Sequence, residues 1–358
     1  MRLSEQRAQE AFFGHIADAK SAICTALGFS PSLNWVDDFL FFRLSHTTIT
    51  DSDNEFHHYS LEDLFVIARR LGWPWKDSKT RPFNSSFRYL GFDWDIPSRI
   101  VSIPDGKKDR YLEKLSTWVH GRKFTRKETE SILGTLVHCS LILPNGRSWL
   151  PALSCFTASF NHSTSPFIRR TPNTSVINDV SWRRHELSKD VCGSVLSQPL
   201  PPQDFGIWVD TSISWGIGIV FNGFRQSWRL KSGWNRNGRD IGWAEFVALE
   251  LGILFAISHN FSNIHFLIHS DNQGVIHALK GGKSRNYEQN LVLQWITELS
   301  TTSNIHISPT YTPSAENLAD KPSRGIALVH LPHSSFSLSI HSNLIPFISL
   351  SSFDIVKF

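Results

Sequence analysis

Two aspartates, Asp37 and Asp38, stand side by side in "SLNWVDDFLFFRL" (residues 32–44), between two short runs of large apolar residues. Such runs predict two strands, each with a buried face, and place the aspartates at the tip of a hairpin. Aspartate is a common turn former, so the pair is consistent with a plain turn. It is also consistent with a divalent-metal site, because neighbouring carboxylates repel each other and lose hydration unless a cation lies beside them. The segment alone leaves both interpretations open.

A second set of acids lies toward the C-terminus, at the ends of predicted elements. Asp210 closes the strand "GIWVD", and Asp271 ends the strand "FLIHSD". Glu245 lies near the start of a long helix, and Asp320 lies in the short helical stretch "ENLADKPSRG". Carboxylates at strand ends face the crevice where αβ proteins bind ligands. Four converging there would need cations, and hard oxygen ligands suit Mg²⁺ or Mn²⁺. Two such ions about 4 Å apart form an arrangement that supports phosphodiester cleavage.

Each of these aspartates also has a purely structural explanation, as a turn residue or an N-cap, and Asp271 fits an N-cap well. The joint pattern of four acids at element ends within one predicted unit favours the metal site. Glu245 competes with Glu250 on the same helix. At 100° per residue, Glu245 lies on the stripe of Ala248, Gly252 and Ala256, whose small side chains allow close approach to a sheet. We therefore favour Glu245 as the fourth ligand.

Composition indicates a globular chain of two or three domains. Of 358 residues, 41% are hydrophobic and 19% charged, which excludes a disordered chain. The net charge of +4 permits a polyanionic partner without requiring one. The four cysteines contain no CxxC pair, which argues against a disulfide framework or a zinc knuckle and suits a reducing compartment. No apolar run is expected to span a bilayer, and the N-terminus lacks the apolar core of a signal peptide. We expect an intracellular protein, nuclear or cytoplasmic, that is neither secreted nor membrane-bound.

The N-terminal half predicts a helix over residues 5–27, the aspartate hairpin, a helix over residues 61–73 and strands within residues 87–104. Residues 104–160 are expected to be helical and basic, with Tyr111, Trp118 and Phe124 interleaved among the lysines and arginines. That pattern is consistent either with a solvated helix face or with a surface that holds a phosphate backbone. Residues 161–204 read as a connecting segment with one helix, "SWRRHELSKDV".

A second αβ unit is predicted from Phe205. Residues 205–210, 215–221 and 225–231 alternate like three antiparallel strands, and a helix over residues 242–257 follows. A strand over residues 264–271, two helices and a last strand over residues 304–312 complete the unit. The tail from Ile326 is rich in Ser, His and Pro and is expected to be poorly ordered.

These motifs resemble those of retroelement polymerases. "NWVDDF" resembles the aspartate-pair hairpin of reverse transcriptases, "RYLGFDWD" is similar to the primer-grip hairpin, and "WKDSKT" to the lysine-bearing segment before it. "GIWVD", "WAEFVALEL", "IHSDNQGVI" and "ENLADKPSRG" together resemble a type 1 ribonuclease H domain. Their order resembles the polymerase polyprotein of LTR-type and DIRS-like retroelements, and the phrase "TPSAENLADKPSRG" leans toward the DIRS-like branch. The resemblance covers roughly residues 10–325.

The resemblance implies an α/β (α+β) chain that begins with part of a reverse-transcriptase palm, over residues 1–104. A helical thumb or connection would follow over residues 105–204. A ribonuclease H-like domain, a five-stranded mixed sheet with flanking helices, would occupy residues 205–325, and residues 326–358 would form the tail.

The resemblance also implies roles for individual residues. Asp37 and Asp38 would be the paired metal-site aspartates of the palm. Lys79 would lie near the incoming phosphates, and Tyr89, Leu90 and Gly91 would belong to the primer grip. The four metal ligands of the ribonuclease H site, which holds two Mg²⁺ or Mn²⁺ ions, would be Asp210, Glu245, Asp271 and Asp320. The implied partners are an RNA–DNA hybrid and a template–primer duplex.

The sequence departs from this family in two places. A further catalytic aspartate normally lies on a strand well upstream of the aspartate pair, whereas here the preceding residues predict one helix with a single acidic candidate near its middle, Asp18. Two-metal nucleotidyl transfer needs that carboxylate, so we expect no autonomous DNA synthesis. The sequence resembles either a 5′-truncated element copy or a mis-started gene model. Many members also carry a histidine shortly before the last aspartate, but "SPTYTPSAEN" has none, and His306 lies inside a predicted strand. Slower turnover is expected; Glu316 and Asn317 are candidates for contacts that support the ligands.

The leading hypothesis is a metal-dependent endoribonuclease that cleaves the RNA strand of RNA–DNA hybrids, attached to a polymerase remnant. The alternative is a decayed or domesticated nucleic-acid-binding protein without turnover. A structural αβ protein unrelated to nucleic acids is the third and least favoured hypothesis.

Overall fold

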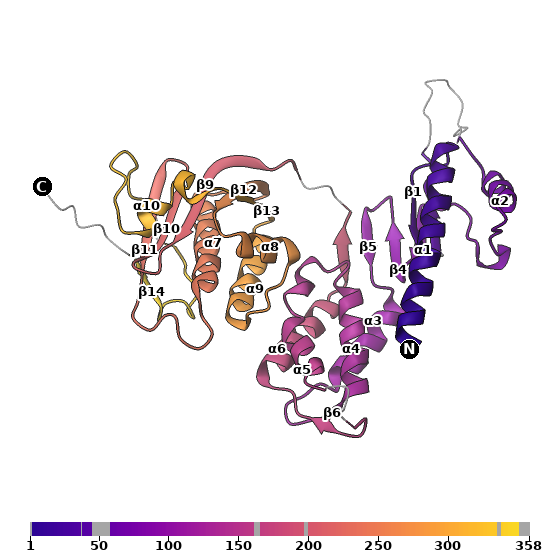
Figure 1. Ribbon diagram of the computed structural model, residues 1–358, viewed down its shortest axis with the longest axis horizontal. Coiled ribbons are helices and arrows are strands. Elements are labelled where there is room, and N and C mark those ends of the chain that lie inside the picture. Colours follow the sequence, from indigo (N-terminus) through magenta and orange to yellow (C-terminus); the bar gives the residue numbers. More distant parts are fainter. Residues whose placement is uncertain are drawn as a thin grey trace, which may run out of the picture. The chain divides into compact units, whose positions relative to one another are not determined.

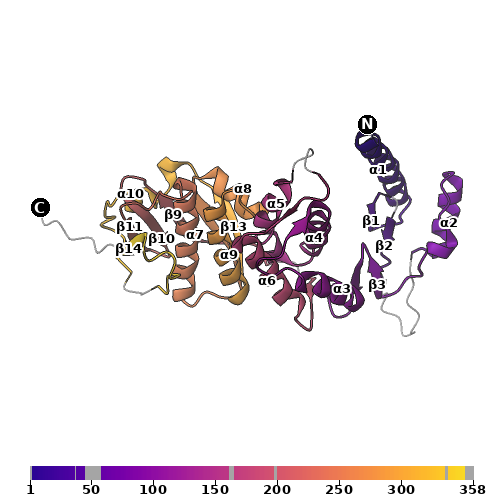
Figure 2. The ribbon, with the colours of Figure 1, turned by 90° about the horizontal axis from the view of Figure 1, so that it is seen from below.

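The fold is mixed α/β, as the sequence predicts. The computed structural model describes residues 2–36, 38–44, 58–160, 165–196, 200–334 and 338–350. The chain divides into two compact units, Met1–Arg99 and Ile100–Phe358, whose elements are coloured along the sequence in Figures 1 and 2. Asp37 lies outside the described residues, so its predicted role stays a prediction.

The first unit contains two hairpins and two α-helices. Its elements are α1 (Arg2–Ala26), β1 (Ser32–Trp35), β2 (Asp38–Phe41), α2 (Leu61–Arg70), the 3₁₀ helix η1 (Asp77–Lys79), β3 (Ser86–Tyr89) and β4 (Phe92–Asp95). β1 pairs with β2 antiparallel, which confirms the hairpin predicted around the aspartate pair. The segment "RYLGFDWD" forms the hairpin β3–β4, and its turn uses positive φ angles at Leu90 and Gly91.

A buried lysine connects α1 to the aspartate hairpin. The Lys20 ammonium lies 3.6 Å from the centre of the Trp75 ring and 5.2 Å from that of Phe39 on β2, and it donates to the Trp73 carbonyl oxygen at 2.9 Å. Burial lowers the pKa of Lys20 to about 8. The aromatic rings and the carbonyl replace water around the charge, which allows a lysine in this interior.

The second unit begins with a group of helices and short strands. They are β5 (Ile100–Ser102), α3 (Asp105–Ser116), β6 (Phe124–Thr125), α4 (Arg126–Cys139), η2 (Pro144–Arg147), α5 (Pro151–Ala158), β7 (Arg169–Arg170), α6 (Thr174–Leu187) and β8 (Gly193–Val195). Trp118 and Phe124 are buried and stack with their ring centres 4.0 Å apart. These aromatics therefore belong to the core. Their burial removes these two rings from the phosphate-binding surface that was one of the two open interpretations, because hydrophobic burial decides their position.

A six-stranded mixed sheet follows, in the order β13-β12-β9-β10-β11-β14. The antiparallel strands are β9 (Gln203–Thr211), β10 (Gly216–Phe221) and β11 (Phe224–Leu230). β12 (Ile264–Ser270) pairs parallel with β9 on one side and with β13 (Ile305–Tyr311) on the other. The helices are α7 (Ile241–Ser258), α8 (Gln273–Gly281), α9 (Tyr287–Thr302) and α10 (Asp320–Ser323), with the 3₁₀ helix η3 (Ser314–Glu316) before α10. The five predicted strands and the mixed character of the sheet are confirmed, but the sheet has a sixth strand that was not predicted, β14 (Ile348–Leu350).

Helix α7 is the centre of the core of this sheet domain. Every residue from Trp243 to Ala256 is buried. By length and composition alone α7 is apolar enough to cross a membrane, so the expectation that no such run exists is wrong. Because 78% of the helix is buried inside the structure, packing against the sheet and α9 explains its apolar character.

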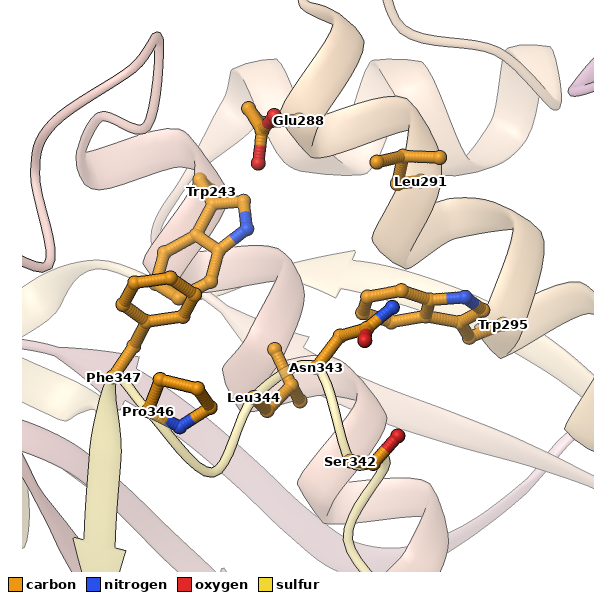
Figure 3. A pocket seen from close by; sticks show the side chains of 9 residues that line it. All are labelled: Trp243, Glu288, Leu291, Trp295, Ser342, Asn343, Leu344, Pro346 and Phe347. Carbon is orange, nitrogen blue, oxygen red and sulfur yellow. The ribbon is translucent and has the colours of Figure 1, made fainter. Parts of the chain in front are cut away.

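The C-terminal segment also differs from expectation. Instead of forming a poorly ordered tail, residues 338–350 cover α7 and α9 and end in β14 (Ile348–Leu350), which pairs with β11. Leu344 and Ile348 are 1% and 3% exposed. Next to this segment lies a pocket of about 350 Å³, with Trp243 and Phe347 on one side and Trp295 on the other (Figure 3). The isolated apolar residues among serines and histidines gave no periodic signal, yet the core of the domain is incomplete without them.

Replacing Leu344 by alanine should lower the free energy of unfolding by about 2–5 kcal/mol, because it removes a fully buried side chain and leaves a cavity. Urea titration followed by tryptophan fluorescence measures the effect. Val329→Ala, at a side chain that is 97% exposed, is the matched control and should change little. Equal midpoints for the two variants would contradict the packing described for the C-terminal segment.

Candidate metal centre

Asp210 lies near the end of β9, directly opposite Gly218 on β10. Its neighbour Val209 is fully buried in the core, and strand alternation therefore turns Asp210 to the other face of the sheet. The Asp210 carboxylate is only 4% exposed and accepts a hydrogen bond from the Ser323 hydroxyl. A strand end with a buried acid is the position predicted from the sequence.

Glu245 reaches the same place from α7. Gly252, two turns further along the helix, lies against the β9 side chain Val209, as the predicted small-residue stripe requires: a Cβ at Gly252 would be 3.0 Å from the Val209 Cγ1 atom. Glu245 is 4% exposed, and its Oε2 atom has no hydrogen-bond partner. Glu250 is also buried, but it belongs to no group of metal-binding side chains among the described residues.

Asp271 follows β12 and does not cap the next helix. The N-cap of α8 is Asn272, whose side chain accepts the Val275 backbone N–H at 3.1 Å. The Asp271 carboxylate is thus left to face the other acids, with the Ser314 hydroxyl as its donor. The N-cap interpretation of Asp271 is wrong, because the asparagine one position later satisfies the helix terminus.

The three carboxylates converge. Asp210, Glu245 and Asp271 each offer an oxygen, and these atoms lie within 4.8 Å of one another. Burial, together with the charges of Asp271 and Asp320, raises the pKa of Asp210 to about 6, against the lowering effect of the Ser323 bond. Burial, together with the charges of Asp210 and Asp271, raises the pKa of Glu245 well above its ordinary value. A cation would offset the repulsion between these carboxylates and would bind the Glu245 Oε2 atom, which has no hydrogen-bond partner. The three acids therefore fit Mg²⁺ or Mn²⁺.

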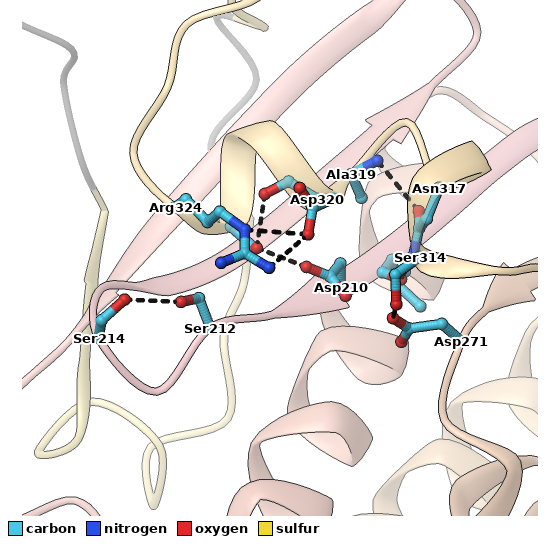
Figure 4. A network of polar contacts seen from close by, with 11 residues as sticks. Asp210, Ser212, Ser214, Asp271, Ser314, Asn317, Ala319, Asp320 and Arg324 are labelled. Atoms are coloured by element: carbon cyan, nitrogen blue, oxygen red, sulfur yellow. Dashed lines mark hydrogen bonds and ion pairs between the residues drawn. The ribbon is translucent and has the colours of Figure 1, made fainter.

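Asp320, the fourth predicted ligand, lies beside this group, but its carboxylate is bound to Arg324. Its Oδ1 atom accepts hydrogen bonds from Arg324 at 3.0 Å from Nε and 2.8 Å from Nη2. Figure 4 shows Asp320 and Arg324 at the short helix next to Asp210, with Asp271 and Ser314 on the side of Asp210 that is away from Arg324. The structure therefore brings three of the four acids into one group and places the fourth at its edge.

The predicted residues of the first unit do not form a comparable group. Asp38 is exposed, and its carbonyl oxygen accepts a hydrogen bond from the Tyr89 hydroxyl at 3.2 Å. Asp18 is exposed and accepts from Asn34 on β1 at 2.9 Å. Lys79 is exposed at the end of η1. Within the described ranges, no cluster of three metal-binding side chains includes Asp38.

Three further contacts at the second-unit site were not predicted from the sequence: the Ser323 and Ser314 hydroxyls on two of the acids, and Arg324 on the third. Serines are common, and nothing in the sequence distinguishes these two. Asn317, a predicted supporting residue, donates to the Val209 carbonyl oxygen at 3.0 Å and thereby connects the loop before α10 to β9. His306 lies within β13 as predicted.

Comparison with known proteins yields little. No protein-family model and no curated protein matches the chain. Among solved structures, the foamy viral protease-reverse transcriptase dRH in complex with ds DNA is similar at 14% identity and a TM-score of 0.34, over 83% of this chain and 48% of that chain. The foamy viral protease-reverse transcriptase in complex with RNA/DNA hybrid is similar at 14% identity and a TM-score of 0.36, over 82% of this chain and 37% of that chain. The present chain thus spans less than half of either relative.

Metal affinity should depend steeply on pH. Asp210 and Glu245 must each lose a proton to bind the ion, and each contributes a fall in affinity of about tenfold per pH unit below its own pKa. Affinity should therefore fall most steeply below the pKa of Asp210, about 6, and level off above the highest pKa of the group. The raised pKa of Glu245 moves the plateau to higher pH. Calorimetric Mn²⁺ titrations between pH 5 and 8.5 measure this dependence. A dissociation constant that is constant over this range would contradict a buried three-carboxylate site.

Proposed function

We propose that the sheet domain of the second unit is a metal-dependent endoribonuclease that cleaves the RNA strand of RNA–DNA hybrids. The observation that carries the proposal is the convergence of Asp210, Glu245 and Asp271 within 4.8 Å, with one buried oxygen unpartnered. Without a cation these three carboxylates repel one another, and their hard oxygen ligands suit divalent ions that also bind phosphate.

The chain's own residues would hold the ions and fix the geometry. Asp210, Glu245 and Asp271 supply the buried oxygens, and Asp320 would join them after releasing Arg324. Once bound, the ions supply an activated water and charge stabilisation at the leaving oxygen. Ser314 and Ser323 each donate to one carboxylate, which restricts the directions in which Asp271 and Asp210 present their oxygens.

The nucleic acid partner follows from charge and from the chemistry of the hybrid. Exposed basic side chains on and between α3 and α4 offer contacts to phosphates; they are Arg110, Lys114, Arg122, Lys123 and Lys127. The 2′-hydroxyls of an RNA strand, exposed in a wide minor groove, distinguish it from DNA. The first unit would contact a template–primer duplex but is not proposed to polymerise by itself, since Asp38 belongs to no cluster of three metal-binding side chains among the described residues.

We also propose an intracellular location. All four cysteines are free thiols, and three of them, Cys24, Cys139 and Cys192, are buried. A chain of this size that uses no disulfide suits a reducing compartment.

The test is a cleavage assay on the full chain with a hybrid labelled on either strand. With Mg²⁺ or Mn²⁺ we expect the RNA strand alone to be cut, at internal positions, and EDTA to stop the reaction. Folded protein that cuts neither strand with either metal would overturn the proposal. If that protein still retained the hybrid in a salt-sensitive and EDTA-insensitive manner, it would be a binding protein without turnover.

A further inference from the structure

On the strand next to Asp210, the sheet has no side chain at the position opposite this acid. In the antiparallel pair β9–β10, Asp210 is opposite Gly218, so the two positions share one face of the sheet. Any other residue at position 218 would place a side chain next to the Asp210 carboxylate. Glycine adds no side chain here, so another segment of the chain can occupy this space.

The backbone of α10 fills that space. A Cβ atom at Gly218 would lie 2.3 Å from the Ser323 backbone nitrogen and 2.5 Å from the Ala319 carbonyl oxygen. Real Cβ atoms do not approach backbone atoms so closely, and backbone cannot rotate away as a side chain can. α10 therefore rests directly on the backbone of β10, at a distance that only glycine allows.

This close contact brings the Ser323 side chain to Asp210, the first predicted metal ligand. Ser323 is fully buried, and its hydroxyl lies within hydrogen-bond distance of the Asp210 Oδ2 atom and of the Asp320 carbonyl oxygen, the latter at 2.8 Å. A hydroxyl proton serves one acceptor at a time, and the carboxylate is the stronger acceptor.

The same turn of helix carries Asp320. Ala319, Asp320 and Ser323 are thus placed together by the contact at Gly218, and the position of Asp320 relative to Asp210 depends on it. Arg324 holds Asp320 at the edge of the group, so a displacement of α10 would change the distance between the fourth carboxylate and Asp210.

We propose that Gly218 and Ser323 are positioning residues of the metal centre: Gly218 sets the distance of α10 from the sheet, and Ser323 orients Asp210 for shared coordination with Asp320. This inference rests on the proposed function, since it assumes that these acids bind divalent ions. It assigns no direct contact with substrate to either residue.

The test is calorimetric Mn²⁺ binding by the full chain, compared for the wild type and Ser323→Ala. We expect Ser323→Ala to unfold at nearly the same temperature and to bind Mn²⁺ about tenfold more weakly or worse. Ser159→Ala is the matched control, because the Ser159 hydroxyl donates to a carbonyl three residues earlier and lies on an exposed helix end. Wild-type affinity in Ser323→Ala would overturn the role of Ser323.

Gly218→Ala tests the close contact itself. We expect fewer bound ions or weaker binding in this variant, because its Cβ displaces α10, whereas Gly134→Ala, with open space around it, should bind as the wild type does. Unchanged binding by folded Gly218→Ala would overturn the role of Gly218; if this variant does not fold, Ser323→Ala decides the inference.

The two proposals fail separately. A wild type that binds Mn²⁺ but cleaves no hybrid overturns the proposed function and leaves the positioning roles to be judged on binding alone. A wild type that cleaves, with Ser323→Ala and Gly218→Ala both binding as the wild type does, overturns the positioning roles alone. A wild type that binds no Mn²⁺ overturns both.

Discussion

Asp271→Asn should lower the rate of RNA-strand cleavage by about a thousandfold or more. The Asp271 carboxylate faces Asp210 and Glu245 within 4.8 Å, and its amide analogue keeps the shape but loses the charge. Charge stabilisation by metal ions at such sites is worth several kcal/mol in the transition state, and each 1.36 kcal/mol corresponds to about a factor of ten in rate. Initial rates on a labelled hybrid, at saturating Mg²⁺ and Mn²⁺, measure the loss.

The matched control for this substitution is Asp190→Asn, at an exposed aspartate in the same unit. It removes the same charge far from the carboxylate group in sequence and should cleave at the wild-type rate. Because Asp271→Asn relieves repulsion among buried acids, we expect it to fold at least as well as the wild type without metal. Full activity of folded Asp271→Asn would exclude the carboxylate group as the cleavage site.

Glu245→Gln and Glu250→Gln should have opposite consequences, although both glutamates are buried on α7. Glu245 belongs to the carboxylate group, so its replacement should abolish cleavage and weaken Mn²⁺ binding at least tenfold. Glu250 has no partner in that group, so Glu250→Gln should cleave normally. This pair of variants decides directly which glutamate is the ligand.

Glu250 should instead appear in the pH dependence of stability. Burial raises the pKa of Glu250 from 4.5 to about 8, so between these values the unfolded chain is ionised while the folded chain holds the proton. The stability due to this group is complete below pH 4.5 and is lost as the pH rises to about 8, at roughly 1.4 kcal/mol per unit. Urea unfolding of metal-free protein between pH 5 and 8.5 should show a shallower loss for Glu250→Gln. Parallel curves for this variant and the wild type would contradict an isolated buried carboxyl.

Local periodicity in the sequence predicted most of the strands and helices of the sheet domain in the second unit. Alternation predicted β9, β10 and β11, and the small-residue stripe on α7 correctly indicated that the Gly252 face lies against the sheet, which favours Glu245 over Glu250. Both patterns are local, since they depend only on the repeat of a strand or a helix and on which face is buried. The positions of the acids at element ends could be read for the same reason.

The sequence alone, by local pattern, determined a mixed α/β chain with acids at the ends of strands and helices. Only the tertiary structure decided how they meet: that Asp210, Glu245 and Asp271 converge, that Asn272 rather than Asp271 caps α8, and that Arg324 holds Asp320 aside. The hydrogen bond from Ser323 to Asp210 connects residues 113 positions apart in the sequence. It depends on Gly218, which lies on a third element, β10. The burial of Leu344 and Ile348 likewise depends on surfaces of α7 and β11 that exist only after folding. Such contacts leave no local period in the sequence, because they depend on packing between distant segments.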